Sequence, residues 1–199
     1  MRWVSIVGAA LMLAGCGETP SNFTSEYTTI DREKCTLLSQ DEEAQTASWR
    51  CQRFRDIEVQ VSEGDLRDYL SFGENDDGAW PSNQTLAPYN RLDKTLEWRL
   101  AQFDDRWVPV ATIVRYFTRV PAGEDEFIEG EVIVVSKFDD TQTCQMAYVD
   151  VISNEDAIEL ARQVADAYAL DFDCDRDRPM RIGLPGPSLP DEGFSPAGG

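Results

Sequence analysis

Alternation of apolar and polar residues along the chain predicts β-strands in its first half. Residues 48–54 carry spaced aromatic and apolar side chains, and residues 57–61 alternate strictly between apolar and polar side chains. The turn-forming residues 63–65 separate this alternation from residues 66–72, where apolar side chains recur. A turn between two such runs is typical of a β-hairpin, so we expect one here.

Longer apolar runs in the second half predict the main sheet. Residues 107–120 are almost continuously apolar, which is typical of a strand buried on both faces. Further strands are predicted at residues 96–103, 126–138 and 143–151. Short turns connect the strands at residues 107–120, 126–138 and 143–151, and we therefore expect these three to form a meander within one antiparallel sheet.

A helical period appears after Val151. Ser153 and Asp156 have the spacing of a capping box, so the helix is predicted to begin there. Its apolar face comprises Ala157, Ile158, Ala161, Val164, Ala165 and Tyr168. A helix with one apolar face packs on a sheet, so the predicted fold class is α+β, an antiparallel sheet meander with a C-terminal helix on one face.

Polar segments set the expected domain boundaries. Residues 16–26 are small and polar and are expected to form a flexible tether, followed by one domain over residues 27–178. Residues 36–47 are interpreted as a loop or short helix, and residues 73–88 as a long loop. Residues 179–199 are rich in Pro and Gly and are expected to be disordered.

The N-terminus has the layout of an export signal. A basic Met1-Arg2 precedes an apolar run of about ten residues, which is too short to span a bilayer. The run ends in Leu13-Ala14-Gly15-Cys16, which resembles the lipobox of bacterial lipoproteins. The resemblance implies cleavage after residues 1–15 and acylation of Cys16 with diacylglycerol and palmitate. The alternative is an ordinary signal peptide with a chance cysteine at its cleavage site.

The same resemblance predicts a location. In lipoproteins of Gram-negative bacteria an Asp after the lipidated Cys favours retention at the inner membrane, whereas this chain has Gly17. We therefore expect a protein of the cell envelope that is lipid-anchored, at the outer membrane and facing the periplasm. The expected partner of Cys16 is the lipid bilayer.

The other four cysteines are an even number in an exported chain, which favours two disulfides. Of the three possible pairings we favour Cys35 with Cys51 and Cys144 with Cys174, because each joins neighbours in sequence. A zinc site is disfavoured, since the chain lacks any C-x-x-C pair and any His.

The formal net charge of −19 disfavours nucleic acid as a partner, because such a surface repels phosphate backbones. Solubility is the simplest reason for the charge. The alternative is attraction of a cationic partner or a divalent ion. Two acidic segments, 74–78 and 171–177, fail the pattern of a calcium loop, so no metal site is assigned.

The absence of His excludes a triad with a His base, and no nucleophile elbow, phosphate loop or dinucleotide-binding turn is present. Paired carboxylates remain available in principle, with Glu97, Glu131 and Asp150 on predicted strands. Each is more simply explained by solvent exposure or pairing with Arg. No catalytic residue and no cofactor is therefore assigned, and we do not expect an enzyme.

Arg99 and Arg115 lie on predicted strands, and Arg115 interrupts an apolar run. An unpaired buried charge costs several kcal/mol, so each arginine needs a carboxylate or an anionic ligand. The sequence leaves both interpretations open, an ion pair or an anion-binding spot.

Four short motifs carry a second resemblance: EGDLR at 63–67, EWRL at 97–100, ATIVR at 111–115 and CQMAYVD at 144–150. Together they resemble a group of small secreted alphaproteobacterial proteins over roughly residues 27–175. The resemblance implies an exported protein and assigns no reaction.

Three functions remain open. The first is a non-catalytic envelope protein that binds a partner protein or a small ligand of unknown identity. The second is a periplasmic inhibitor of a basic enzyme such as lysozyme, to which an acidic protein is steered by charge. The third is a small carboxylate-based hydrolase of envelope sugars.

Overall fold

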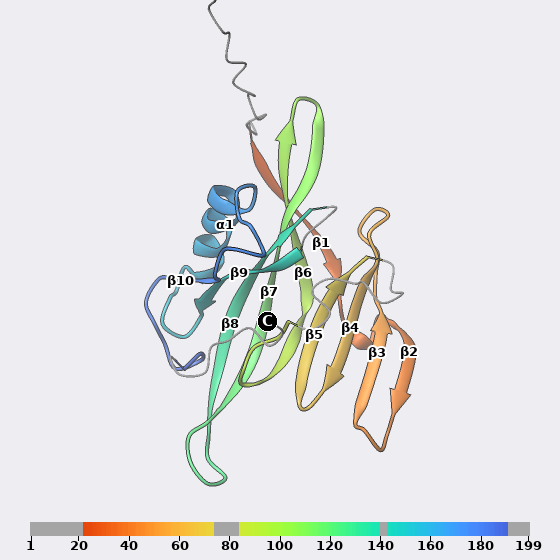
Figure 1. Cartoon of the computed structure of the whole chain (residues 1–199), viewed down its shortest axis with the longest axis vertical. Coiled ribbons are helices and arrows are strands. Elements are labelled where there is room, and N and C mark those ends of the chain that lie inside the picture. Colours follow the sequence, from red (N-terminus) through yellow and green to blue (C-terminus); the bar gives the residue numbers. More distant parts are fainter. Residues whose placement is uncertain (1–21, 74–83, 140–142, 191–199) are drawn as a thin grey trace, which may run out of the picture.

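The computed structural model describes residues 22–73, 84–139 and 143–190. Within them the protein is mostly β, with two largely antiparallel sheets and one α-helix (Figure 1). The helix packs on one face of the larger sheet, and the smaller sheet lies on its other side. The predicted α+β class, with a helix on one sheet face, is confirmed.

The larger sheet has six strands in the order β1-β6-β7-β8-β9-β10. Its strands are β1 Phe23–Thr29, β6 Tyr89–Phe103, β7 Arg106–Pro121, β8 Phe127–Phe138, β9 Thr143–Asp150 and β10 Met180–Ile182. Strands β7 to β9 form the predicted meander, β6 pairs antiparallel with β7, and within the described residues only β10 pairs in parallel.

The smaller sheet has the order β2-β3-β4-β5, with strands β2 Thr36–Asp41, β3 Thr46–Arg50, β4 Val59–Gly64 and β5 Arg67–Phe72. A 3-10 helix, η1 Arg32–Lys34, precedes it. The β4–β5 hairpin confirms the prediction for residues 57–72. The prediction of a loop or short helix over 36–47 is wrong for β2, which pairs with β3 across a register shift between Leu37 and Ser39 although all six of its residues are exposed.

A core of aromatic residues joins the two sheets. Trp98 on β6 is fully buried and stacks on Phe54 with ring centroids 4.5 Å apart. Phe72 and Phe138 meet the Trp98 ring edge-on at 5.3 and 5.4 Å, and the indole N–H donates to Thr28 Oγ1 at 2.9 Å. Such pairs contribute about 0.5–1.5 kcal/mol each beyond area burial, so this cluster fixes how the sheets pack.

The helix α1 Ala157–Tyr168 forms a second core with the opposite face of the larger sheet. Its buried residues are Ala157, Ala161, Val164 and Ala165, as predicted, whereas Ile158 and Tyr168 are exposed. The predicted start at Ser153 is wrong. The Ser153 amide donates to Asp150 Oδ1 at 2.9 Å, and the helix begins four residues later.

The structured part of the chain extends beyond the predicted domain of 27–178 at both ends. Strand β1 begins at Phe23, so part of the expected tether pairs with β6. Residues 180–190 add β10 and a final turn, although residues 179–199 were expected to be disordered. The reason is side-chain bonding: Asp150 Oδ2 accepts from the Ser188 amide at 2.9 Å, and Asn154 Nδ2 donates to the Leu184 carbonyl at 2.9 Å.

Replacing Gly186 by Val is expected to loosen this final segment. A Cβ at Gly186 would lie 2.2 Å from Asp150 Cγ and 2.3 Å from Ser153 Oγ, so the backbone or these hydrogen-bonded side chains must shift. We expect a loss of about 1–3 kcal/mol in the free energy of unfolding, measured by urea denaturation. Gly123→Val is the control, since its nearest neighbour is a Glu126 side chain at 3.6 Å. Equal stability of the two variants would contradict the packing role of residues 183–190.

Two disulfides crosslink segments of the domain that are close in sequence. Cys35 is bonded to Cys51 and Cys144 to Cys174, which confirms the favoured pairing. Two disulfides are typical of an extracytoplasmic protein. Within the described ranges no helix is long and apolar enough to cross a membrane. Cys16 and the expected signal segment lie outside the described residues.

Candidate functional site

A cleft of about 880 Å³ lies where turns of the smaller sheet meet the first residues of β6. The β2–β3 turn, the β4–β5 hairpin and η1 form one wall, and β6, β7 and β8 form the other. Because Arg32, Arg67, Arg91 and Arg119 line it, we call it the arginine cleft.

An exposed length of strand edge explains why the cleft forms here. Strand β1 pairs with β6 only between Thr95 and Ala101, so the first residues of β6 have no strand on that side. The β4–β5 hairpin takes this edge. The Asn90 amide donates to the Leu66 carbonyl at 3.1 Å, and the Leu92 amide donates to Asp68 Oδ2 at 2.8 Å.

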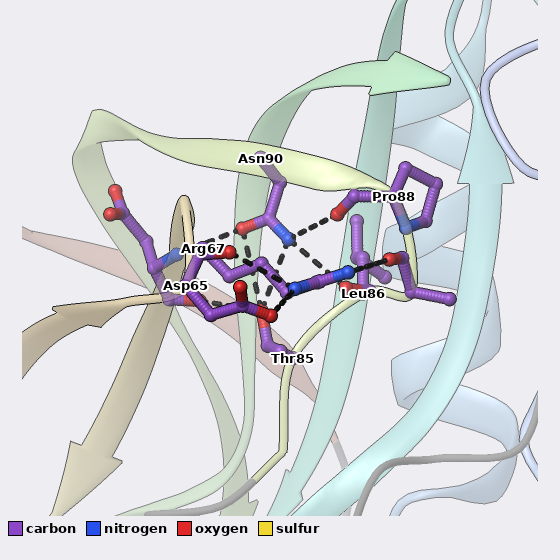
Figure 2. Close-up of polar contacts among 8 residues, drawn as sticks. Asp65, Arg67, Thr85, Leu86, Pro88 and Asn90 are labelled. Carbon is purple, nitrogen blue, oxygen red and sulfur yellow. Dashed lines mark hydrogen bonds and ion pairs between the residues drawn. The ribbon is translucent and has the colours of Figure 1, made fainter. Parts of the chain in front are cut away.

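Asn90 holds the approach to β6 in place, as Figure 2 shows. Its amide nitrogen donates to the carbonyls of Leu86 and Pro88 at 3.1 and 2.9 Å. Arg67 braces the same segment, because its Nη2 donates to the Ala87 carbonyl at 2.8 Å. The wall of the cleft is therefore fixed by side chains bonded to backbone.

Every carboxylate that lines the cleft is bound to an arginine. Arg32 bridges Glu63 and Asp68, linking η1 to the β4–β5 hairpin. Arg67 pairs with Asp65 in the hairpin turn. On the opposite wall of the cleft, Arg119 of β7 donates through Nε to Glu129 Oε1 of β8 at 3.0 Å. None of these four acids is left as a free base or nucleophile.

Aromatic rings lie between the arginines on the sheet. Tyr89 stands opposite Arg119 across β6 and β7, and Arg91 stands opposite Phe117. Directly opposed residues project to the same face, so these four side chains form one patch. The guanidinium of Arg91 lies 5.8 Å from the Phe117 ring centroid, and that of Arg67 lies 5.4 Å from the Tyr89 ring. Both distances are within the range of cation–π contacts.

Burial raises the pKa of Asp68 above its usual value of 3.8, while the Leu92 amide and Arg32 oppose the shift. The folded protein therefore keeps this proton to a higher pH than the unfolded chain. As pH rises through that window, the contribution of Asp68 to the free energy of unfolding falls.

Asp68→Asn should remove this decline. Relative to the unmodified protein, the stability of the variant should rise as the pH increases from about 4, the usual pKa of an Asp carboxyl, towards neutrality. Urea denaturation across that range measures the difference, and Asp105→Asn, in the exposed β6–β7 turn, controls for the loss of one charge. A stability difference that stays constant with pH would show that Asp68 titrates alike in both states.

The arginines singled out in the sequence lie elsewhere. Arg99 binds Asp166 of α1 through Nε at 2.6 Å and Nη2 at 2.7 Å, and the pKa of Arg99 is raised by this hydrogen bond. Arg115 Nη1 donates to Glu131 at 2.8 Å on the neighbouring strand. Both arginines therefore form ion pairs, and neither lines the arginine cleft.

The three acids considered for catalysis are not brought together either. Glu97 is buried and binds Arg162 of α1 at 2.8 Å, Glu131 binds Arg115, and Asp150 accepts backbone amides. Each already has a structural partner. Within the described parts of the chain, no group of three or more metal-binding side chains was found.

Sequence reasoning did not find the cleft, although one signal was present. Arg115, Phe117 and Arg119 occupy alternate positions of a strand, and so share one face. Arg91, which stands opposite Phe117, could not be identified, because neither strand's sequence determines the cross-strand register. Comparison with protein-family models, with curated proteins and with solved structures found no match.

Proposed function

We propose that this protein is a lipid-anchored envelope protein that binds a ligand or partner in the arginine cleft and performs no catalysis. In this proposal Cys16 carries the acyl chains, and the domain faces the periplasm from the outer membrane. The lipobox-like Leu13-Ala14-Gly15-Cys16 supports the anchor. The two disulfides support an oxidising compartment.

The pairing of acids with arginines in the cleft carries the binding proposal. General acid–base chemistry needs a carboxyl group that can exchange a proton with a substrate. Here Glu63 and Asp68 share Arg32, Asp65 has Arg67, and Glu129 has Arg119. Such a surface presents fixed donors and rings, which suits recognition.

The two other functions have less support. A glycosidase needs two carboxyl groups free to act on a substrate, and the four acids of the cleft are held. An inhibitor of a basic enzyme would present an acidic face. The cleft instead balances four arginines against four acids, Glu63, Asp65, Asp68 and Glu129, for a formal sum of zero.

Photo-crosslinking in cells tests this proposal. A photoreactive phenylalanine analogue at Leu66, which is 68% exposed and lines the cleft, should form adducts with an envelope molecule. The same analogue at Ile152, which is 59% exposed and does not line the cleft, is the matched control. Adducts specific to Leu66 support a binding site. Identical products at both positions, or no adduct at Leu66, contradict one.

A further inference from the structure

Arg91 differs from the other three arginines of the cleft in having no carboxylate partner. It is exposed on β6, and within the described ranges its side chain takes part in no hydrogen bond or ion pair. Its recorded contact is with the face of the Phe117 ring. A guanidinium over a ring keeps its N–H donors for another group, and their fork geometry matches carboxylate and phosphate.

Apolar surface lies close to these donors. Leu66 is strongly exposed at the tip of the β4–β5 hairpin, and Tyr89 and Phe117 line the same cleft. A group attached to the anion can therefore cover apolar atoms while Arg91 holds the charge. The combination fits a small organic anion better than a bare inorganic ion.

The charge of the protein limits how many negative charges that anion can carry. The chain as a whole carries −19, so a polyanion is repelled from most of its surface. Only Arg91 among the cleft arginines lacks an acid, so one anionic group can be neutralised without breaking an existing pair. The site suits a single carboxylate or phosphate.

We propose that the arginine cleft binds a small organic anion, with its single carboxylate or phosphate on Arg91 and its ring or apolar body against Phe117, Tyr89 and Leu66. The inference rests on the proposed function, since it names the ligand class of the same cleft. It also makes Arg91 the residue that selects for charge.

Calorimetric titration of the purified full chain tests this ligand class with four probes: benzoate, phenyl phosphate, neutral benzamide and inorganic phosphate. Benzoate or phenyl phosphate should bind at least about tenfold more tightly than benzamide, because charge-assisted hydrogen bonds are strong. Whichever of the two binds better distinguishes a carboxylate ligand from a phosphate ligand. Inorganic phosphate should bind more weakly than phenyl phosphate, because it lacks the ring.

The variant Arg91→Gln should reduce the affinity for the better anion by about tenfold and leave benzamide unchanged. Arg106→Gln removes the same charge from an exposed position at the start of β7 and is the matched control, with melting temperatures confirming that both variants fold. Equal losses in the two variants, or equal binding of benzoate, phenyl phosphate and benzamide, would overturn the ligand class. Adducts at Leu66 would then still support the binding function with a different ligand.

Discussion

A Cys16→Ser variant is expected to lose its acyl groups and to move from the detergent phase to the aqueous phase on phase separation. Each methylene buried in a bilayer contributes about 0.8 kcal/mol, so two or three acyl chains account for stable attachment. The acidic surface offers no alternative, since a net charge of −19 is repelled by anionic lipid heads.

Labelling with radioactive palmitate measures the loss of the acyl groups, and the share of the protein found in each phase after detergent phase separation measures the move to the aqueous phase. Label should fall to background in Cys16→Ser and persist in Gly17→Ser, which changes the neighbouring residue and keeps the thiol. Palmitate retained in Cys16→Ser would show that acylation occurs at another residue and would remove the basis for the anchor.

Removal of either disulfide should have the largest effect on stability. In the chain-entropy model, a bridge across 16 residues contributes about 3 kcal/mol and one across 30 residues about 4 kcal/mol. We expect the double variant Cys144→Ala and Cys174→Ala to lose slightly more than the double variant Cys35→Ala and Cys51→Ala. The former also frees the chain after α1 from β9, whose residues are all buried.

Urea denaturation of both double variants, with the unmodified protein in reducing and non-reducing buffer, measures these losses. The reduced protein should be less stable than either double variant, because it lacks both bridges. If reduction leaves the unfolding midpoint unchanged, the bridges do not stabilise the fold and the chain-entropy account is wrong here.

The predicted parts of the fold are those whose apolar residues form a recognisable pattern in the sequence. Residues 57–61 alternate between apolar and polar side chains, whereas β7 to β9 are long and largely buried apolar runs. Strand β2 was missed because all six of its residues are exposed, and nothing in its pattern distinguishes it from a loop. The division of the strands between two sheets was also missed, because it depends on which strands pair, and the hydrophobic pattern does not show that.

The end of the chain and the cleft were missed for a related reason. Residues 183–190 have no apolar period, and they are held by Asp150 and Asn154, whose bonds form only after folding. The cleft depends on Arg91 meeting Phe117 across two strands and on the β4–β5 hairpin reaching the edge of β6. By contrast, Cys16 and the disulfide cysteines are local signals, which sequence reasoning can identify.

Blocking the arginine cleft is the most direct test of a binding function. Ala44 lies on the exposed β2–β3 turn and lines the cleft, so Ala44→Trp should project a large ring into it without breaking any ion pair of its walls. Glu43→Trp places the same ring on the same turn at a position that does not line the cleft. Both variants are combined with the photoreactive residue at Leu66, and adducts are measured in cells. The account predicts that Ala44→Trp abolishes the Leu66 adducts and that Glu43→Trp preserves them, whereas adducts that persist in Ala44→Trp would contradict it.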